Sequence, residues 1–246
     1  MRTILCLVLV AALVTRAATA PESLDAVRGA RARLGGDVWS RVLEIENRAD
    51  ENVYPDITYA LVFEFNGMLW FYAPYDGTQS LSLHVGRLEA EKADLQPLLA
   101  AIHPGFVRFH EPADAAPSRA YRDGELPNGC FIDSLVAAGE LLATGKRVSN
   151  AGILLYYAKG QGSRQGHAVL AYETEAGVFV DDSERVRPQK VMDRWTQRPM
   201  DIARRHERSL RGKLVDAKLV PLRVDGPAMK AIASVGGRDE GRGFRG

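Results

Sequence analysis

Apolar and β-branched residues gather in short runs along the first part of the chain, a pattern typical of β-strands. Residues 57–65 and 68–72 are two such runs, and only Asn66-Gly67 separates them. Because Asn and Gly both accept positive φ, this dipeptide predicts a β-hairpin. Shorter runs predict further strands at 38–45, where continuation of the preceding helix is the alternative, at 80–85 and at 106–109.

Between these runs, apolar residues recur at helical spacing. Residues 21–36 and residues 88–102 each place apolar side chains on one face, as amphipathic helices do. Pro97 lies inside the second of these segments and either kinks the helix or marks a restart. The polar, proline-containing stretch 111–123 is expected to be a loop or a boundary.

The second half of the chain also mixes the two patterns. Residues 131–144 carry an apolar stripe at helical spacing, and Gly145 is a natural helix end. Runs typical of strands occupy 153–158, 167–172, 178–180 and 217–224, and a basic, helical stretch follows Pro188.

Together these elements predict an α+β fold. We divide the chain into a leader at 1–20, an N-terminal accessory α+β region at 21–125, a core at 126–225 and a tail at 226–246. The tail is rich in Gly and Arg, has few apolar residues at its end and is expected to be disordered.

The leader has the pattern of an export signal. A charged Arg2 precedes an apolar run at 4–14, and small residues follow up to Ala20. The run is too short to span a membrane comfortably, and no later segment is long and apolar enough to do so. The sequence therefore predicts a periplasmic or secreted protein without a stable membrane span in the mature chain, and leaves the cleavage site open. An uncleaved membrane anchor is the alternative.

Net charge does not point to a nucleic-acid partner. The chain of 246 residues has a formal charge of +1, whereas nucleic-acid-binding domains usually carry a clear basic excess. Basic residues do gather at 204–213. That cluster is either a solvated helix face or a site for an anionic partner.

Cysteine usage singles out one thiol. The chain has 2 cysteines, and Cys6 lies in the leader, so Cys130 is alone in the expected mature chain. Exported proteins usually pair their cysteines. A remaining single thiol is buried and inert, bridged to another molecule, or reactive.

The surroundings of Cys130 favour the reactive alternative. Asn128-Gly129 forms a turn just before the predicted helix, so Cys130 falls in its first turn. Helix starts present unpaired N–H groups and a partial positive charge, which favour a thiolate over a thiol. The Cys130 backbone N–H is also placed to stabilise an oxyanion.

A base and an acid are expected on a neighbouring hairpin. His167 opens one predicted strand, and Asp181 and Asp182 close the next, so all three lie at the same end of the hairpin. A carboxylate there can hold one ring nitrogen while the other faces the thiol. The sequence offers no cofactor or metal motif: the Gly160–Gly166 loop lacks the ending of a phosphate loop, and the histidines lack ligand spacing.

Three segments resemble the Cys, His and Asp motifs of the transglutaminase-like cysteine peptidases, and most of all the bacterial transglutaminase-like cysteine proteinases. They are Asn128-Gly129-Cys130, Gly166–Leu170 and Gly177–Asp182. The resemblance implies a papain/transglutaminase-like core in which a helix with the nucleophile packs on an antiparallel sheet with the base, after a smaller sheet-and-helix region. It implies that Cys130 is the nucleophile, His167 the base and Asp182 the orienting acid, with Asp181 as the alternate.

The chain departs from that family pattern in two places. The bacterial proteinases usually carry an Asp just before the Cys and acids just after it, whereas here Gly129 precedes and Asp133 is the nearest acid that follows. Papain-like enzymes often place a Gln at the oxyanion hole. Gln79 is a candidate for that role, with an ordinary turn residue as the alternative.

The resulting hypothesis is an exported thiol-dependent hydrolase or acyltransferase that acts on peptide or glutamine-like amides through a thioester. Its expected partner is a peptide or protein substrate. One alternative is a non-catalytic binding or scaffold module on the same fold, with Trp70–Tyr72 and Tyr75 as a recognition surface. Another, ranked lower, is an enzyme similar to the arylamine acetyltransferases, whose Arg-Gly-Gly motif before the nucleophile is missing here.

Overall fold

The computed structural model describes residues 20–48, 55–75, 77–82, 94–103, 105–159, 164–183, 185, 187–206, 213–223, 229–230 and 232. The predicted leader lies outside these residues except for Ala20, which begins the first helix. In this part of the chain the fold is α+β, as the sequence predicts, and it contains two antiparallel sheets.

The first sheet has five strands in the order β4-β3-β2-β1-β5. The elements of this half are α1 (Ala20–Leu34), β1 (Ser40–Asn47), β2 (Ile57–Phe65), β3 (Met68–Ala73), β4 (Gly77–Ser82), α3 (Leu95–Ile102), β5 (Phe106–His110) and α4 (Arg119–Asp123). Asn66 and Gly67 have φ of 54° and 74°, so the predicted hairpin between β2 and β3 is confirmed with the positive φ that the dipeptide allows.

Differences from the predicted elements of this half are local. The strand predicted at 38–45 is β1, at Ser40–Asn47, and not a continuation of the helix. The stretch 111–123, expected to be a loop or a boundary, ends in the short helix α4. Pro97 lies in the first turn of α3, where proline is tolerated because the first N–H groups of a helix have no intrahelical acceptor. The expected start of that helix at 88 lies outside the described residues.

The second sheet has five strands in the order β10-β6-β7-β8-β9. Its half contains α5 (Cys130–Ala143), β6 (Asn150–Lys159), β7 (Arg164–Thr174), β8 (Gly177–Asp181), β9 (Gln189–Met192), α6 (Pro199–His206) and β10 (Lys213–Pro221). The prediction of a helix directly after Pro188 is wrong, because β9 precedes α6 there. Since both sheets have five strands, the first region is also not the smaller one.

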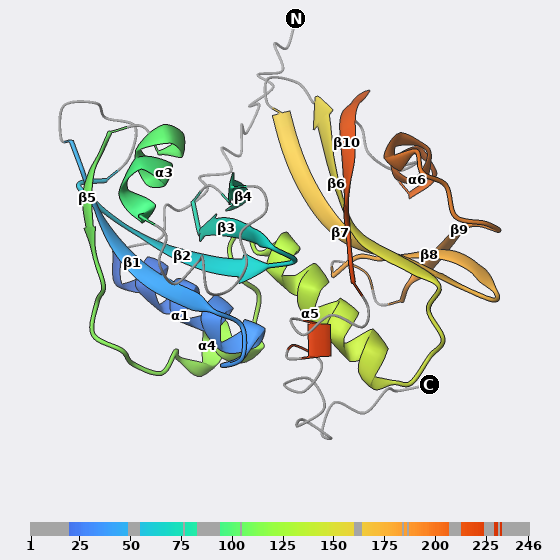
Figure 1. Ribbon diagram of the computed structural model, residues 1–246, viewed down its shortest axis with the longest axis horizontal. Coiled ribbons are helices and arrows are strands. Elements are labelled where there is room, and N and C mark those ends of the chain that lie inside the picture. Colours follow the sequence, from blue (N-terminus) through green and yellow to red (C-terminus); the bar gives the residue numbers. More distant parts are fainter. Residues whose placement is uncertain are drawn as a thin grey trace, which may run out of the picture.

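Helix α5 lies between the two sheets (Figure 1). Its buried side chains, including Ile132 and Leu135, belong to one hydrophobic cluster with Phe63 of β2 and Leu170 of β7. Two further clusters cover the outer faces, one under α3 and one under α6. The helix that carries Cys130 is therefore packed from both halves of the chain.

The prediction of disorder from residue 226 onward is wrong for two residues of the tail. Met229 is 0% exposed and Ile232 is 2% exposed, and both belong to the cluster around α5. These apolar side chains gain more by burial than a Gly/Arg segment does. The rest of the tail, from residue 233, lies outside the described residues.

Candidate active site

Cys130 is the first residue of α5 and is held there by the first sheet. Asn128 has a φ of 51° and donates a side-chain hydrogen bond to the Pro74 carbonyl at 2.7 Å. The Tyr72 hydroxyl of β3 donates to the Pro127 carbonyl at 2.8 Å. Both contacts fix the turn that precedes the thiol, so the position of Cys130 depends on the half of the chain that does not carry the predicted base.

The same turn leaves no room for a side chain at Gly129. A Cβ built there would overlap the Leu126 Cβ, and the Gly129 N–H donates to the Leu126 carbonyl at 3.0 Å. The Asp expected just before the nucleophile in the resembling proteinases therefore has no space here unless the turn moves.

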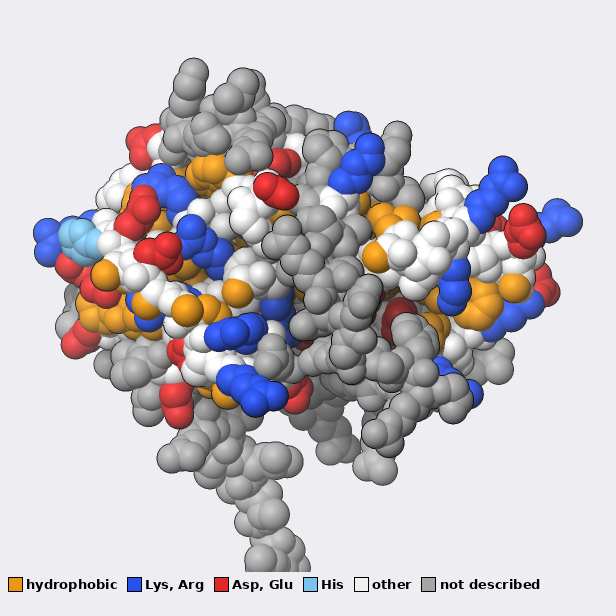
Figure 2. All heavy atoms as spheres, turned by 90° about the horizontal axis from the view of Figure 1, so that it is seen from below, with side chains coloured by type: hydrophobic (Ala, Val, Ile, Leu, Met, Phe, Trp, Pro, Cys, Tyr) orange, Lys and Arg blue, Asp and Glu red, His pale blue; other side chains and the backbone are white. Residues whose placement is uncertain are grey.

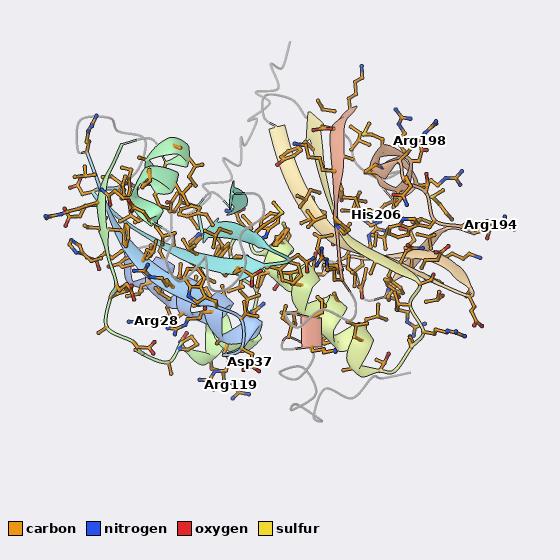
Figure 3. The ribbon with its side chains drawn as sticks, in the orientation of Figure 1. Arg28, Asp37, Arg119, Arg194, Arg198 and His206 are labelled. Atoms are coloured by element: carbon orange, nitrogen blue, oxygen red, sulfur yellow. The ribbon has the colours of Figure 1, made fainter. Side chains whose placement is uncertain are left out.

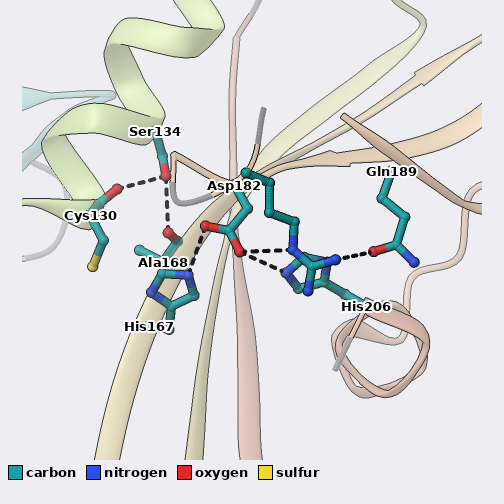
Figure 4. Close-up of polar contacts among 8 residues, drawn as sticks. Cys130, Ser134, His167, Ala168, Asp182, Gln189 and His206 are labelled. Atoms are coloured by element: carbon teal, nitrogen blue, oxygen red, sulfur yellow. Dashed lines mark hydrogen bonds and ion pairs between the residues drawn. The ribbon is translucent and has the colours of Figure 1, made fainter. Parts of the chain in front are cut away.

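Ser134 connects the start of α5 to β7. Its hydroxyl lies 2.7 Å from the Cys130 carbonyl and 3.2 Å from the Ala168 carbonyl, and the residue is 4% exposed. Ala168 directly follows His167, so this buried hydroxyl links the backbone of Cys130 to the backbone next to His167 (Figure 4). Sequence reasoning missed Ser134, although a polar residue on the apolar stripe of a helix is a visible signal.

His167 lies between the thiol and a carboxylate. Its Nε2 is 3.2 Å from Asp182 Oδ1, and the Cys130 side chain lies close enough to the ring to raise its pKa. The sulfur lies on the side of the ring away from Asp182 (Figure 4), so Nδ1 faces it. The His167 side chain is 20% exposed and Cys130 is partly exposed, which leaves both accessible from solvent.

The charge on His167 is strongly stabilised. Burial alone would lower its pKa, but hydrogen bonds to Asp182 and Cys130, with the coulombic attraction of both groups, raise the pKa from 6.5 to about 10. His167 is therefore an imidazolium at neutral pH.

The structure resolves which aspartate contacts His167. Asp182 is 4% exposed and makes the contact. Asp181 ends β8 opposite Leu170, and burial, Glu140 and Asp182 raise its pKa. Adjacent residues of a strand point to opposite faces, so Asp181 faces α5 while Asp182 shares the α6 side of the sheet with His167.

A second histidine, His206 at the end of α6, also contacts this carboxylate. Its Nε2 is 3.2 Å from Asp182 Oδ2. No sequence signal pointed to this residue, because neither its spacing from Asp182 nor the bounds of α6 could be read from a hydrophobic pattern. In Figure 3 His206 lies between α6 and the sheet, whereas Arg194 and Arg198 project outward.

Of the two predicted oxyanion donors, the structure describes the Cys130 N–H but not the Gln79 side chain. The Cys130 N–H lies at the start of α5, where N–H groups lack intrahelical acceptors. Gln79 pairs with Phe71 in β4, but its side chain lies outside the described residues, so its role stays a prediction. Strand β4 does approach the turn, since a Cβ on Gly77 would lie 3.7 Å from Asn128 Cβ.

Most of the recognition surface predicted for a binding module is buried, and of its four aromatic residues only Tyr75 is partly exposed. Trp70 is 3% exposed, and Phe71 and Tyr72 are 0% exposed, so these aromatics form core. A hollow of about 360 Å³ does lie near α1 and is lined by Arg28, Trp39 and Asp114, among others. On the face seen from below, acidic and basic side chains are intermingled (Figure 2).

The described residues contain no group of three His, Cys, Asp or Glu side chains arranged to hold a metal ion. Within the same residues no helix has the length and apolar character needed to cross a bilayer. Comparisons of the chain with protein-family models, with curated proteins and with solved structures found no match. Function is therefore inferred from the geometry of the site itself.

Proposed function

We propose that this protein is an exported thiol-dependent hydrolase or acyltransferase that acts on peptide or glutamine-like amides, on a papain/transglutaminase-like core. One observation carries the proposal: the His167 ring lies between the Cys130 side chain at a helix start (Figure 4) and the buried Asp182 carboxylate, which its Nε2 contacts at 3.2 Å. Nucleophile, base and orienting acid in this order are the parts of a thiol-based acyl transfer site.

The reaction follows from these contacts. The Cys130 thiolate attacks the amide carbon and forms a C–S bond, while the carbonyl oxygen becomes an oxyanion near the N–H groups at the start of α5. As the C–N bond breaks, the His167 imidazolium gives the Nδ1 proton to the leaving amine. The neutral ring then removes a proton from water or from an acceptor amine, which attacks the thioester carbon. The C–S bond breaks, and the thiolate of Cys130 and the imidazolium of His167 are restored.

Asp182 has an orienting role in this scheme. Its Oδ1 accepts the Nε2–H of His167 and so fixes which ring nitrogen faces the sulfur. Because the carboxylate is buried, its attraction for the imidazolium is weakly screened.

Alkylation of the thiol tests the proposal. Iodoacetamide near neutral pH should modify Cys130 at least about tenfold faster than a free cysteine, because thiolate rather than thiol reacts. The His167→Gln variant should lose this excess, and hydrolysis of casein or a glutamine peptide should vanish in Cys130→Ala. If Cys130 of the wild type were alkylated no faster than free cysteine and no amide were hydrolysed, the enzyme proposal would be refuted and the binding module would be favoured.

A further inference from the structure

Both oxygens of the Asp182 carboxylate are occupied. Oδ1 faces His167, whereas Oδ2 lies 3.2 Å from His206 Nε2 (Figure 4). Oδ2 also lies 3.6 Å from Arg185 Nε. Arg185 is itself held by a hydrogen bond of 2.9 Å from its guanidinium to Gln189 Oε1 in β9. The acid of the candidate triad is therefore clamped from the side opposite the imidazole.

His206 is built into the fold at this place. Its side chain is 0% exposed, and the neighbouring Ile202 and Ala203 of α6 belong to the cluster on the outer face of the second sheet. The buried Tyr156 ring packs edge-on against both histidines, at 5.5 Å from His167 and 6.2 Å from His206. The two rings and the carboxylate are thus held by β6, β7 and α6 together.

We propose that His206 and Arg185 are positioning residues, which hold Oδ2 so that Asp182 stays ionised with Oδ1 directed at His167. This inference rests on the proposed function for its purpose. A buried carboxylate without donors either takes up a proton or turns toward another partner. In either case the imidazolium loses its anion, so α6 and the turn after β8 set the strength of the base.

The other charged group next to Asp182 has the opposite effect. Asp181 adds a negative charge on the neighbouring position, and the two carboxylates disfavour each other's ionised form. Donors on Oδ2 from α6 and from Arg185 offset this repulsion. The arrangement therefore needs the clamp more than an isolated buried acid would.

The test measures the pH at which His167 loses its proton, by NMR of the imidazole nitrogens, in the full chain. His206→Leu removes a donor and should lower this midpoint by about one pH unit, the value expected for a hydrogen bond to a charged group. His206→Gln keeps an N–H donor and should stay close to the wild type. Arg185→Met changes a side chain that is 37% exposed and should lower the midpoint by a smaller amount.

His103 supplies a matched control. It is 2% exposed, and its Nε2 lies 2.8 Å from Asn47 Oδ1 in the other half of the chain. His103→Leu should lower stability as much as His206→Leu does, yet leave the midpoint of His167 in place. A purely structural role for His206 would make the two variants indistinguishable in this readout.

Each outcome decides the inference. It is overturned if His206→Leu and Arg185→Met both keep the wild-type midpoint, or if His103→Leu moves it equally. Should His206→Leu not fold, Arg185→Met decides alone. Because the NMR midpoint needs no turnover, an inert Cys130 would refute the proposed function while leaving the clamp on Asp182 to be judged separately.

Discussion

Replacing Asp182 by Asn should lower the pKa of His167 by about two units. Burial opposes the charge on His167, yet its pKa rises from 6.5 to about 10 because of Asp182 and Cys130. At about 1.4 kcal/mol per unit this corresponds to a net stabilisation of the imidazolium of about 5 kcal/mol. A hydrogen bond to a charged group contributes about 1.5–3 kcal/mol, so Asp182 accounts for roughly half of the rise.

The measurement is an NMR titration of the His167 ring nitrogens between neutral and alkaline pH. Asp182→Asn keeps the size of the side chain and an oxygen that can accept the Nε2–H, so the ring should stay in place while the charge is removed. Alkylation of Cys130 should stop being faster than that of free cysteine at a lower pH than in the wild type, because the imidazolium persists over a narrower pH range.

Asp181→Asn is the matched control for this prediction. It removes the neighbouring carboxylate, which ends β8 opposite Leu170 rather than contacting His167. We expect a shift below about half a unit, since a charge outside hydrogen-bond contact is more strongly screened. Equal shifts in the two variants, or none in Asp182→Asn, would refute the assignment of Asp182 as the orienting acid.

Three further predictions concern stability and the turn before the thiol. Arg33→Met should lower the free energy of unfolding in urea by about 3 kcal/mol, because the carboxylate of its partner Asp133 is only 16% exposed. Arg31→Met breaks an ion pair whose arginine is 41% exposed and should lower that free energy by under about 1 kcal/mol. Similar losses in the two variants would contradict this reasoning. Gly129→Ala should lower the free energy of unfolding by about 1–3 kcal/mol through overpacking, and it should slow the alkylation of Cys130. Gly36→Ala, with nothing within 4 Å of the added Cβ, should change neither quantity. The pKa of His167 is raised in the folded state, so its contribution to the free energy of unfolding is complete below pH 6.5 and is lost as pH rises through about 10. His167→Gln should flatten this decline of stability with pH. An unchanged slope would show that another group causes the decline.

The fold could be predicted wherever a local signal decided the conformation. Asn66-Gly67 fixed a hairpin because positive φ is rare outside Asn and Gly, and the apolar stripe before Gly145 predicted α5 within a residue. Strand β9 escaped prediction, because four residues flanked by polar turns give no clear period. Pairing of β9 with β8 is a tertiary contact that its own sequence does not encode.

The site could be predicted only in part, for a related reason. Residues 178–180 are all apolar, because β8 packs against a hydrophobic cluster on each face, so no alternation told Asp181 from Asp182. In the structure, the register of β8 against β7 places Asp181 opposite Leu170, and Asp182 is the aspartate that contacts His167. His206 arrives from a helix that follows β9, and its contact with Asp182 depends on how α6 docks rather than on any spacing along the chain.

The arrangement of the two sheets gives the first half of the chain a part in the candidate site. The sulfur is positioned by the turn that Tyr72 and Asn128 hold from the first sheet, whereas the imidazole and its acid are carried by the second. Ser134 joins the two at the start of α5. Because a thiol and its base must lie within hydrogen-bond reach, any relative movement of the sheets changes their contact. The region from α1 to α4 is therefore better understood as half of the support for the site than as an accessory to it.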